Sequence, residues 1–178
     1  MKSTGIVRRV DDLGRIVIPK EIRKTIRIKE SDPLEIYTGS NGEIIFKKYA
    51  MMETMIPKSS ECAQLLAGEI KHPVVISDRD TIIAASGAET KMLLEQRLSP
   101  EAENLIESRK TYSQQKSNKV VYLTDNNKLQ IKWLFPIISN GDIAGALIVL
   151  LPQSSGTPQE AEFLAQFTAK LLGKQIEY

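Results

Sequence analysis

The first fifty positions alternate between short runs of β-branched or apolar residues and clusters of turn-forming residues. The runs predict four strands, at 5–10, 15–18, 33–38 and 43–48. The cluster at 11–14 predicts a tight turn between the first two strands, and Asn41-Gly42 is a strong hairpin signal between the last two. Pro19 stands where proline opens helices, so a short helix is predicted from there to about Ile26.

The first of these strands is apolar on both faces. Ile6 and Val10 fall on one face and Val7 on the other. A strand with two apolar faces needs cover on both sides, and fifty residues cannot build that cover alone. We therefore expect two copies of this region to interleave into one shared core, as an obligate dimer.

After about position 52 the pattern changes to longer helices and strands. Helices are predicted at 53–70, 89–95, 100–110 and from 157 onward, and strands at 74–77, 81–86, 119–124, 130–138 and 143–151. The pattern predicts two domains, 1–52 and 53–178. The second is an α+β domain with an antiparallel sheet, bracketed by an N-terminal and a C-terminal helix that can also pair across a dimer.

The last predicted helix has a clear start signal. Thr157 is a good N-cap, Pro158 follows it, and Glu160 completes a capping box. The apolar residues of this helix form one stripe, made of Leu164, Phe167, Leu171 and Leu172.

Composition and charge narrow the class of protein. With 42% hydrophobic and 26% charged residues the chain is of the soluble globular kind, and no apolar run is long enough for a membrane span. The single cysteine, Cys62, excludes an internal disulfide, and the first residues lack a signal-peptide core, so we expect a cytoplasmic protein. Residues 1–50 hold eleven Lys/Arg against seven Asp/Glu, whereas the remainder holds thirteen against fifteen. A basic first domain favours a polyanionic partner.

The basic residues of the first domain fall into two groups. Arg8 and Arg9 end the first predicted strand, and Arg15 begins the second. On the helix, the basic residues are spaced to share one face: Lys20, Arg23, Lys24 and Arg27. Arginine suits a DNA-binding surface because its guanidinium group holds phosphate or guanine with two parallel hydrogen bonds.

A second interpretation of the same residues remains open. Asp11, Asp12 and Glu21 lie close by in sequence, and basic residues beside acids often form a solvated, ion-paired face that binds nothing. Ile22 and Ile26 share another face of the helix, where we expect them to anchor it to the core.

The segment 2–23 closely resembles the start of AbrB-family transition-state regulators, above all in the run Asp-x-Leu-Gly-Arg, which is followed by two apolar residues and then by Ile18 and Pro19. The resemblance covers residues 1–50 and implies a swapped-hairpin dimer that binds double-stranded DNA through Arg8, Arg15, Arg23 and position 24. Here position 24 is Lys24, which favours a phosphate contact over a paired base contact. Arg9 and Lys20 are further candidates.

The order of elements along the whole chain resembles sporulation regulators of that family. In those the second domain is GAF-like, and dimerisation through both domains builds a homotetramer. The resemblance implies an activator or repressor of late sporulation genes, associated with the nucleoid. The alternative within the same fold family is an antitoxin that neutralises a toxin partner.

GAF-like domains often bind a small molecule, which makes Tyr122, Trp133 and Phe135 candidate ligand-binding residues, although such aromatics also serve simply as core. Trp133 and Phe135 are expected on the strand face that carries Ile131. Catalysis has no support in the sequence, because the one histidine, His72, stands at a helix end and no thiol partner, metal-ligand cluster or phosphate loop is present. We expect no enzyme activity, no cofactor and no metal.

Overall fold

The computed structural model describes residues 4–30, 32–49, 51–87, 90–152 and 156–176. The contacts within it divide the chain into two compact units, Met1–Tyr49 and Ala50–Tyr178. The division falls three residues before the predicted boundary at 52. Met51 and Met52 are both buried within the second unit and therefore belong to its core.

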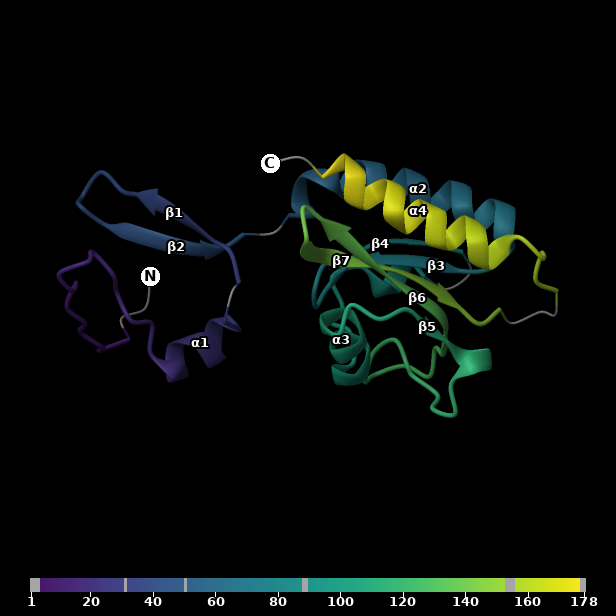
Figure 1. Ribbon diagram of the computed structural model, residues 1–178, viewed down its shortest axis with the longest axis horizontal. Helices are drawn as coiled ribbons and strands as arrows, with labels where there is room; N and C mark the ends of the chain where they lie inside the picture. The colour runs from purple at the N-terminus through teal and green to yellow at the C-terminus, as the bar shows by residue number, and fades with distance from the viewer. Residues whose placement is uncertain (1–3, 31, 50, 88–89, 153–155, 177–178) are drawn as a thin grey trace. The chain divides into compact units, whose positions relative to one another are not determined.

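The first unit contains one short helix and one hairpin (Figure 1). Helix α1 spans Lys20–Ile26, and strands β1 (Leu34–Thr38) and β2 (Ile44–Lys48) pair antiparallel. The turn between the strands is closed by the Gly39 N–H, which donates to the Glu43 carbonyl at 2.8 Å. Gly42 has φ +75°, a conformation that glycine adopts without strain. The helix and this hairpin were predicted and are confirmed.

The strands predicted at 5–10 and 15–18 are wrong for the single chain. Residues 4–19 are extended around a turn, but no ladder pairs form within this described segment. Its apolar side chains are left 39–86% exposed, namely those of Ile6, Val7, Val10, Leu13, Ile16 and Val17. An extended segment becomes a strand only when a neighbouring strand supplies hydrogen bonds, and the first unit of one chain supplies none here.

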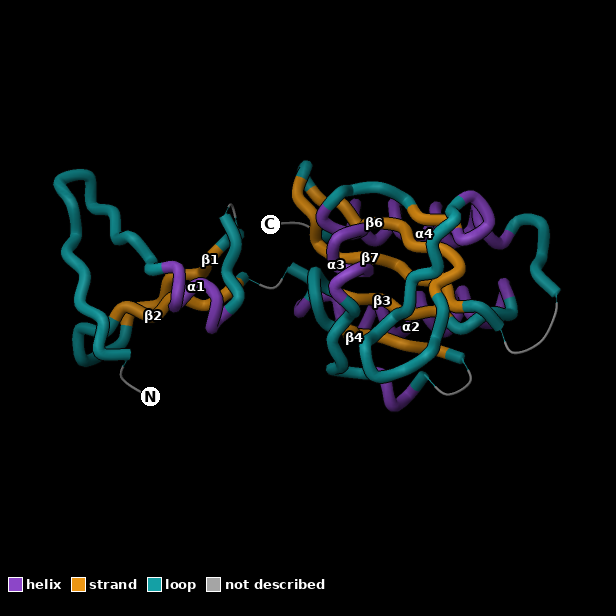
Figure 2. Tube along the Cα trace, turned by 90° about the horizontal axis from the view of Figure 1, so that it is seen from below, coloured by secondary structure: helices purple, strands orange, loops and turns teal. Residues whose placement is uncertain are grey.

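The second unit is built on a five-stranded antiparallel sheet with the order β4-β3-β7-β6-β5. The strands are β3 (Val74–Ser77), β4 (Ile82–Ser86), β5 (Tyr112–Ser113), β6 (Ile131–Ser139) and β7 (Asp142–Leu150). The long helices α2 (Ile56–Ile70) and α4 (Ala161–Gln175) lie side by side over one face of the sheet. Helix α3 (Pro100–Glu107) and the loops around it cover the other face (Figure 2). The described residues of this unit also form short 3₁₀ turns, namely η1 (Glu53–Met55), η2 (Lys91–Leu93) and η3 (Gln114–Lys116).

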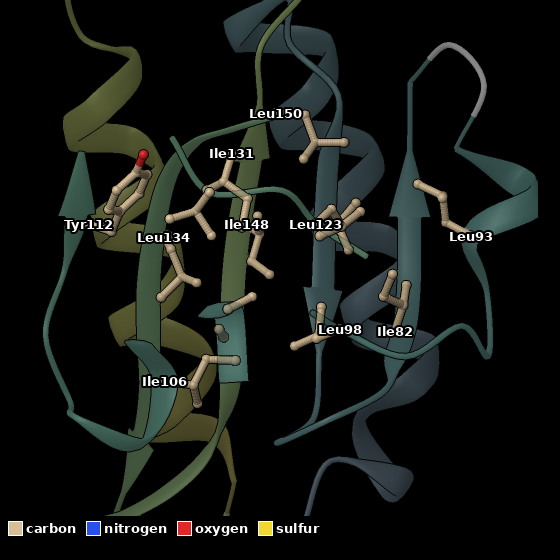
Figure 3. Packing of buried hydrophobic residues seen from close by; sticks show 14 of the residues in the cluster. Ile82, Leu93, Leu98, Ile106, Tyr112, Leu123, Ile131, Leu134, Ile148 and Leu150 are labelled. Carbon is tan, nitrogen blue, oxygen red and sulfur yellow. The ribbon is translucent and has the colours of Figure 1, made fainter. Parts of the chain in front are cut away.

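The main hydrophobic core lies on the α3 side of the sheet (Figure 3). Ile106 from α3 packs with Leu134 of β6 and Ile148 of β7, and the loop residues Leu98 and Leu123 belong to the same cluster. All five side chains are at most 4% exposed, and burial of apolar surface on this scale is the main stabilising term of such a unit.

Two of the predicted elements of the second unit are wrong. Residues 119–124 are a loop that makes only an isolated bridge, Tyr122 to Gln130, and the edge strand is instead β5, which was not predicted. The helix predicted at 89–95 is only the single turn η2, and position 89 lies outside the described residues.

Helix α4 starts later than the capping signal predicted. Its first residue is Ala161, and Thr157 uses its side chain elsewhere, as a partner of His72 and Lys132. The helix buries a face of mainly small residues, Ala161, Ala165, Ala169, Leu172 and Gly173. Of the predicted stripe, Leu172 is buried, whereas Leu164, Phe167 and Leu171 are 36–54% exposed. Small residues face the sheet because the helix approaches it closely, and an alanine-like Cβ at Gly173 would lie 2.2 Å from the Ile138 carbonyl oxygen.

Candidate nucleic-acid interface

The turn at 11–15 is organised around one carboxylate. Asp11 Oδ1 accepts the backbone N–H groups of Leu13 and Arg15 at 3.0 and 2.7 Å, and Oδ2 accepts Arg15 Nε at 2.8 Å. The backbone adds two more bonds, from the Asp11 N–H to the Arg15 carbonyl and from the Gly14 N–H to the Asp11 carbonyl. Hydrogen bonds from the backbone and then the side chain of Arg15 lower the pKa of Asp11 below its ordinary value.

This arrangement fixes the direction of Arg15. The contact with Asp11 occupies Nε, so the terminal Nη groups are left for a further partner, and the Arg15 side chain is 69% exposed. The two Nη groups are the fork that pairs with a guanine edge or a phosphate. The Arg15 side chain is therefore fixed at Nε, and its two terminal Nη groups are available to a ligand.

Helix α1 presents the second basic group to solvent. Lys20, Arg23 and Lys24 are all exposed. The helix ends at Arg27, which has a left-handed backbone with φ 55° and whose N–H caps the Arg23 carbonyl. Of the two predicted anchors, Ile22 is half-buried but Ile26 is 48% exposed, so in the single chain Ile26 does not anchor the helix.

The structure weighs against the ion-paired interpretation. Six basic residues are candidates for DNA contact. Within the described part of the chain, only Arg15 among them takes part in an ion pair or a side-chain hydrogen bond, and its partner is Asp11. The other five are exposed and have no such partner among those residues, namely Arg8, Arg9, Lys20, Arg23 and Lys24. Their positive charge is therefore not neutralised by any residue that the structure describes.

Asp11 is the functional candidate that sequence reasoning missed, since it was considered only as a charge that cancels a neighbour. The signal was present as an aspartate four residues before an arginine, with Gly14 between them in a left-handed conformation, φ +75°. Aspartate side chains commonly accept the backbone N–H two residues on, which makes this a turn-building position.

The three candidate ligand-binding aromatics of the second unit do not share one place. Tyr122 is 43% exposed on its loop. Trp133 and Phe135 are buried on β6, paired with Val149 and Leu147 of β7. The expected face was wrong, because a bulge between Ile131 and Trp133 turns these aromatics away from the Ile131 side of the sheet.

Of the other chemically active side chains of the second unit, His72 is buried and Cys62 is half-buried. His72 is 2% exposed, and the C-cap of α2 is Lys71 rather than His72. Burial raises the pKa of the Cys62 thiol, with a smaller contribution from the charge of Glu61.

Over the described residues, no three or more His, Cys, Asp or Glu side chains gather where they could hold a metal ion. Nor is any helix in the described ranges sufficiently long and apolar to cross a membrane.

Comparison with known proteins covers both units together. A family model described as "Stage V sporulation protein T C-terminal, transcription factor" matches residues 57–177. Stage V sporulation protein T of Bacillus subtilis (strain 168) is 41% identical over 180 residues, which is 99% of this chain and 99% of that protein.

The chain belongs to the stage V sporulation protein T family of transcription factors.

The first unit of this stage V sporulation protein T family member has separate relatives. Transition state regulatory protein AbrB of Bacillus subtilis (strain 168) is 63% identical over 49 residues, 28% of this chain and 50% of AbrB. A model described as "Antidote-toxin recognition MazE, bacterial antitoxin" matches residues 7–53. The predicted resemblance to AbrB is confirmed.

Solved structures resemble the second unit in fold only. Type II free methionine-R-sulfoxide reductase from Thermoplasma acidophilum superposes with a TM-score of 0.50 at 11% identity, covering 69% of this chain and 92% of that one. The GAF domain of the nutrient sensor CodY from Clostridium difficile gives 0.49 at 13% identity, over 66% and 83% of the two chains. The predicted fold class, an AbrB-type domain followed by a GAF-like α+β domain, is confirmed.

Proposed function

We propose that this transcription factor binds double-stranded DNA with the 11–15 turn and helix α1 of two copies, and regulates late sporulation genes. The observation that carries the proposal is the set of exposed basic side chains in segment 8–15 and on helix α1, of which only Arg15 has an ion-pair partner among the described residues. A polyanion is the partner that such a set fits, because each contacted phosphate releases a bound cation from the DNA. The full-length relative named for a stage of sporulation supports the choice of target genes.

The basic residues divide by the contacts they suit. Arg15, held at Nε by Asp11, is placed to read a base edge or clamp a phosphate with its two Nη groups. Arg8 and Arg23 carry the same fork on free side chains. Lys20 and Lys24 add charge for contacts with the phosphate backbone, since a lysine ammonium is a point charge without a planar fork. Arg9 adds a further guanidinium group next to Arg8.

A second copy of the chain completes the first unit. The apolar residues of segment 4–19 are exposed in the single chain, and two copies that interleave would cover them and provide the missing strand partners. On the second unit, apolar side chains of α2 and α4 face solvent beside one another, namely Leu65, Phe163, Phe167 and Leu171. A second contact there would give a homotetramer.

Binding to promoter fragments of the sporulation genes tests the proposal. Arg15→Ala should weaken binding by roughly 1–3 kcal/mol and lower the salt dependence, while the oligomeric mass stays unchanged. Arg109→Ala is the matched control, because Arg109 is an exposed arginine of the second unit. Equal affinity of the Arg15 variant and the wild-type protein would overturn the proposal.

The antitoxin alternative has one observation in its favour, the family match over residues 7–53. Against it stands the second unit, a packed domain with its own core, where an antitoxin would need a segment that folds on its toxin. Purification of the untagged chain with a stoichiometric small protein would support the alternative.

Two further assignments accompany the proposal. A transcription factor acts where the DNA is, so we place the protein in the cytoplasm, associated with the nucleoid. We assign it no catalytic activity, and Tyr122, Trp133 and Phe135 remain candidates for contact with a modulating ligand.

A further inference from the structure

A buried lysine lies at one end of the sheet in the second unit. Lys132, on β6, is 6% exposed. Its ammonium group contacts Thr157 Oγ1, lies 3.3 Å from His72 Nε2, and sits 4.7 Å from the centre of the Trp133 ring. Among the described residues no carboxylate is paired with it. An ammonium group buried without a counter-charge costs several kcal/mol in free energy, so this group calls for a partner.

The hydrogen-bond pattern shows that the His72 ring is neutral and does not supply a negative charge to balance the ammonium group of Lys132. His72 Nδ1 lies 3.2 Å from the Leu150 carbonyl oxygen, which can only accept, so Nδ1 carries the proton. Nε2 lies 2.9 Å from Thr157 Oγ1 and also faces the ammonium group, so Nε2 is an acceptor and the ring is neutral. Desolvation, and then the charge of Lys132, lower the pKa of His72.

The neighbouring indole also lacks a partner. Trp133 is 4% exposed, and its Nε1–H is buried without a hydrogen-bond acceptor in the part of the chain that is described. The Trp133 and His72 rings lie 6.0 Å apart, so the unpartnered indole and the uncompensated ammonium belong to one cluster. A buried donor left unsatisfied costs about 1–3 kcal/mol. An anion that reaches both donors would satisfy both groups.

We propose that Lys132, Trp133 and Thr157 form a binding site for the carboxylate group of a small organic acid. The single positive charge matches a monoanion, because the cost of burying an ion rises steeply with its charge and disfavours a phosphate dianion. Thr157 lies between β7 and α4, four residues before the first residue of α4. A ligand bound to Thr157 would therefore affect the conformation of the chain at the start of that helix.

Trp133 makes the site directly observable, because it is the one tryptophan in the chain. The full-length protein is titrated with acetate, propionate and butyrate while its tryptophan emission and melting temperature are followed. Sodium chloride at equal ionic strength and inorganic phosphate are the comparison titrations. We expect a saturable emission change and a higher melting temperature with the carboxylates, and neither with chloride.

Variants assign the effect to the cluster. Lys132→Met should weaken carboxylate binding at least tenfold, whereas Lys47→Met should leave it unchanged. Lys47 is the matched control because it also lies over an aromatic ring, 4.8 Å from the centre of Tyr37, but in the first unit. If Lys132→Met does not fold, as judged by circular dichroism, Thr157→Val replaces it and should weaken binding as well.

The titrations contain no DNA, so their outcome is independent of the proposed function. The carboxylate site is overturned if the wild-type protein shows no saturable change with any of the three acids. It is equally overturned if phosphate binds more tightly than acetate, or if the folded Lys132 or Thr157 variant responds like the wild-type protein.

Discussion

At the scale of single residues, the most informative side chain of the first unit is an acid. Both carboxylate oxygens of Asp11 accept hydrogen bonds within the turn that carries Arg15. The donors are the backbone N–H groups of Leu13 and Arg15 and the Arg15 Nε. A negative charge close to a DNA-binding surface opposes binding by simple electrostatics. Its role must therefore be to position Arg15, and this role separates it from its neighbour Asp12.

Alanine at position 11 should weaken DNA binding, whereas alanine at position 12 should not. Both Asp11→Ala and Asp12→Ala remove one negative charge, but Asp11→Ala also releases the turn and the Arg15 side chain. We expect binding about tenfold weaker for Asp11→Ala and unchanged or tighter for Asp12→Ala, since each 1.4 kcal/mol is a factor of ten. Fluorescence anisotropy with a labelled promoter duplex measures both. Equal effects of the two variants would show that only the charge matters.

His72 should make the second unit sensitive to acid. Its pKa in the folded protein lies below the ordinary value of 6.5, because of burial and the nearby Lys132. The unfolded chain therefore binds more protons as the pH falls below 6.5, and stability present above that pH is lost on acidification. The groups that face the ring are Lys132 from β6, the Leu150 carbonyl from β7 and the Thr157 hydroxyl.

Urea unfolding followed by Trp133 emission between pH 5 and 7.5 measures this dependence. The wild-type protein should become steadily less stable toward pH 5. His72→Gln keeps a polar side chain but removes the titrating ring, so its stability curve should be flatter. An equally steep curve for the variant would assign the acid sensitivity to the carboxylates of the unit.

At the scale of elements, glycine controls how closely α4 approaches the sheet. Gly173 faces the Ile138 carbonyl oxygen, and a Cβ there would lie 2.2 Å from it, so Gly173→Ala must push the helix away. We expect a loss of about 1–3 kcal/mol in unfolding free energy, as for other overpacked contacts. Gly68→Ala on α2 is the control. Nothing lies within 4 Å of its Cβ, so alanine should stabilise that helix by about 0.5–1 kcal/mol. A neutral Gly173→Ala would mean that α4 is free to shift.

The elements also show what the sequence can and cannot predict. Strands β3, β6 and β7 were located within about a residue, because apolar runs between turn residues are a local signal. The strands predicted at 5–10 and 15–18 have no partner strand within the described part of the first unit, so the local signal alone does not form them. The late start of α4 depends on Thr157, which bonds to His72, 85 residues away in sequence.

The candidate sites divide in the same way. Exposure of Arg8 or Arg23 follows from a local pattern, whereas their lack of an ion-pair partner among the described residues depends on three-dimensional placement. The contact of Lys132 with His72 joins positions 60 residues apart, and periodicity carries no information about it. The bulge before Trp133 likewise reversed the expected face of that strand.

At the scale of the whole molecule, each unit leaves an apolar surface exposed. In the first unit it lies on segment 4–19, where Val7 and Val17 are 86% and 73% exposed. In the second unit it lies on the long helices, where Phe163 and Phe167 stack 6.3 Å apart and Leu65 is 65% exposed. Because each surface belongs to a separate compact unit, two independent contacts between copies would build a closed tetramer.

Charge placed on the helical surface should separate the two contacts. We expect the full chain to have the mass of four copies and residues 1–55 the mass of two, by multi-angle light scattering. Phe163→Glu with Phe167→Glu should reduce the full chain to a dimer, because carboxylates cannot be buried there without partners. Met92→Glu is the matched control, since Met92 is 83% exposed and belongs to η2 rather than to either long helix. The dimeric variant should still bind one DNA site through its paired first units, but lose the added affinity for two linked sites. A variant that remains tetrameric would show that the copies meet through other surfaces of the second unit.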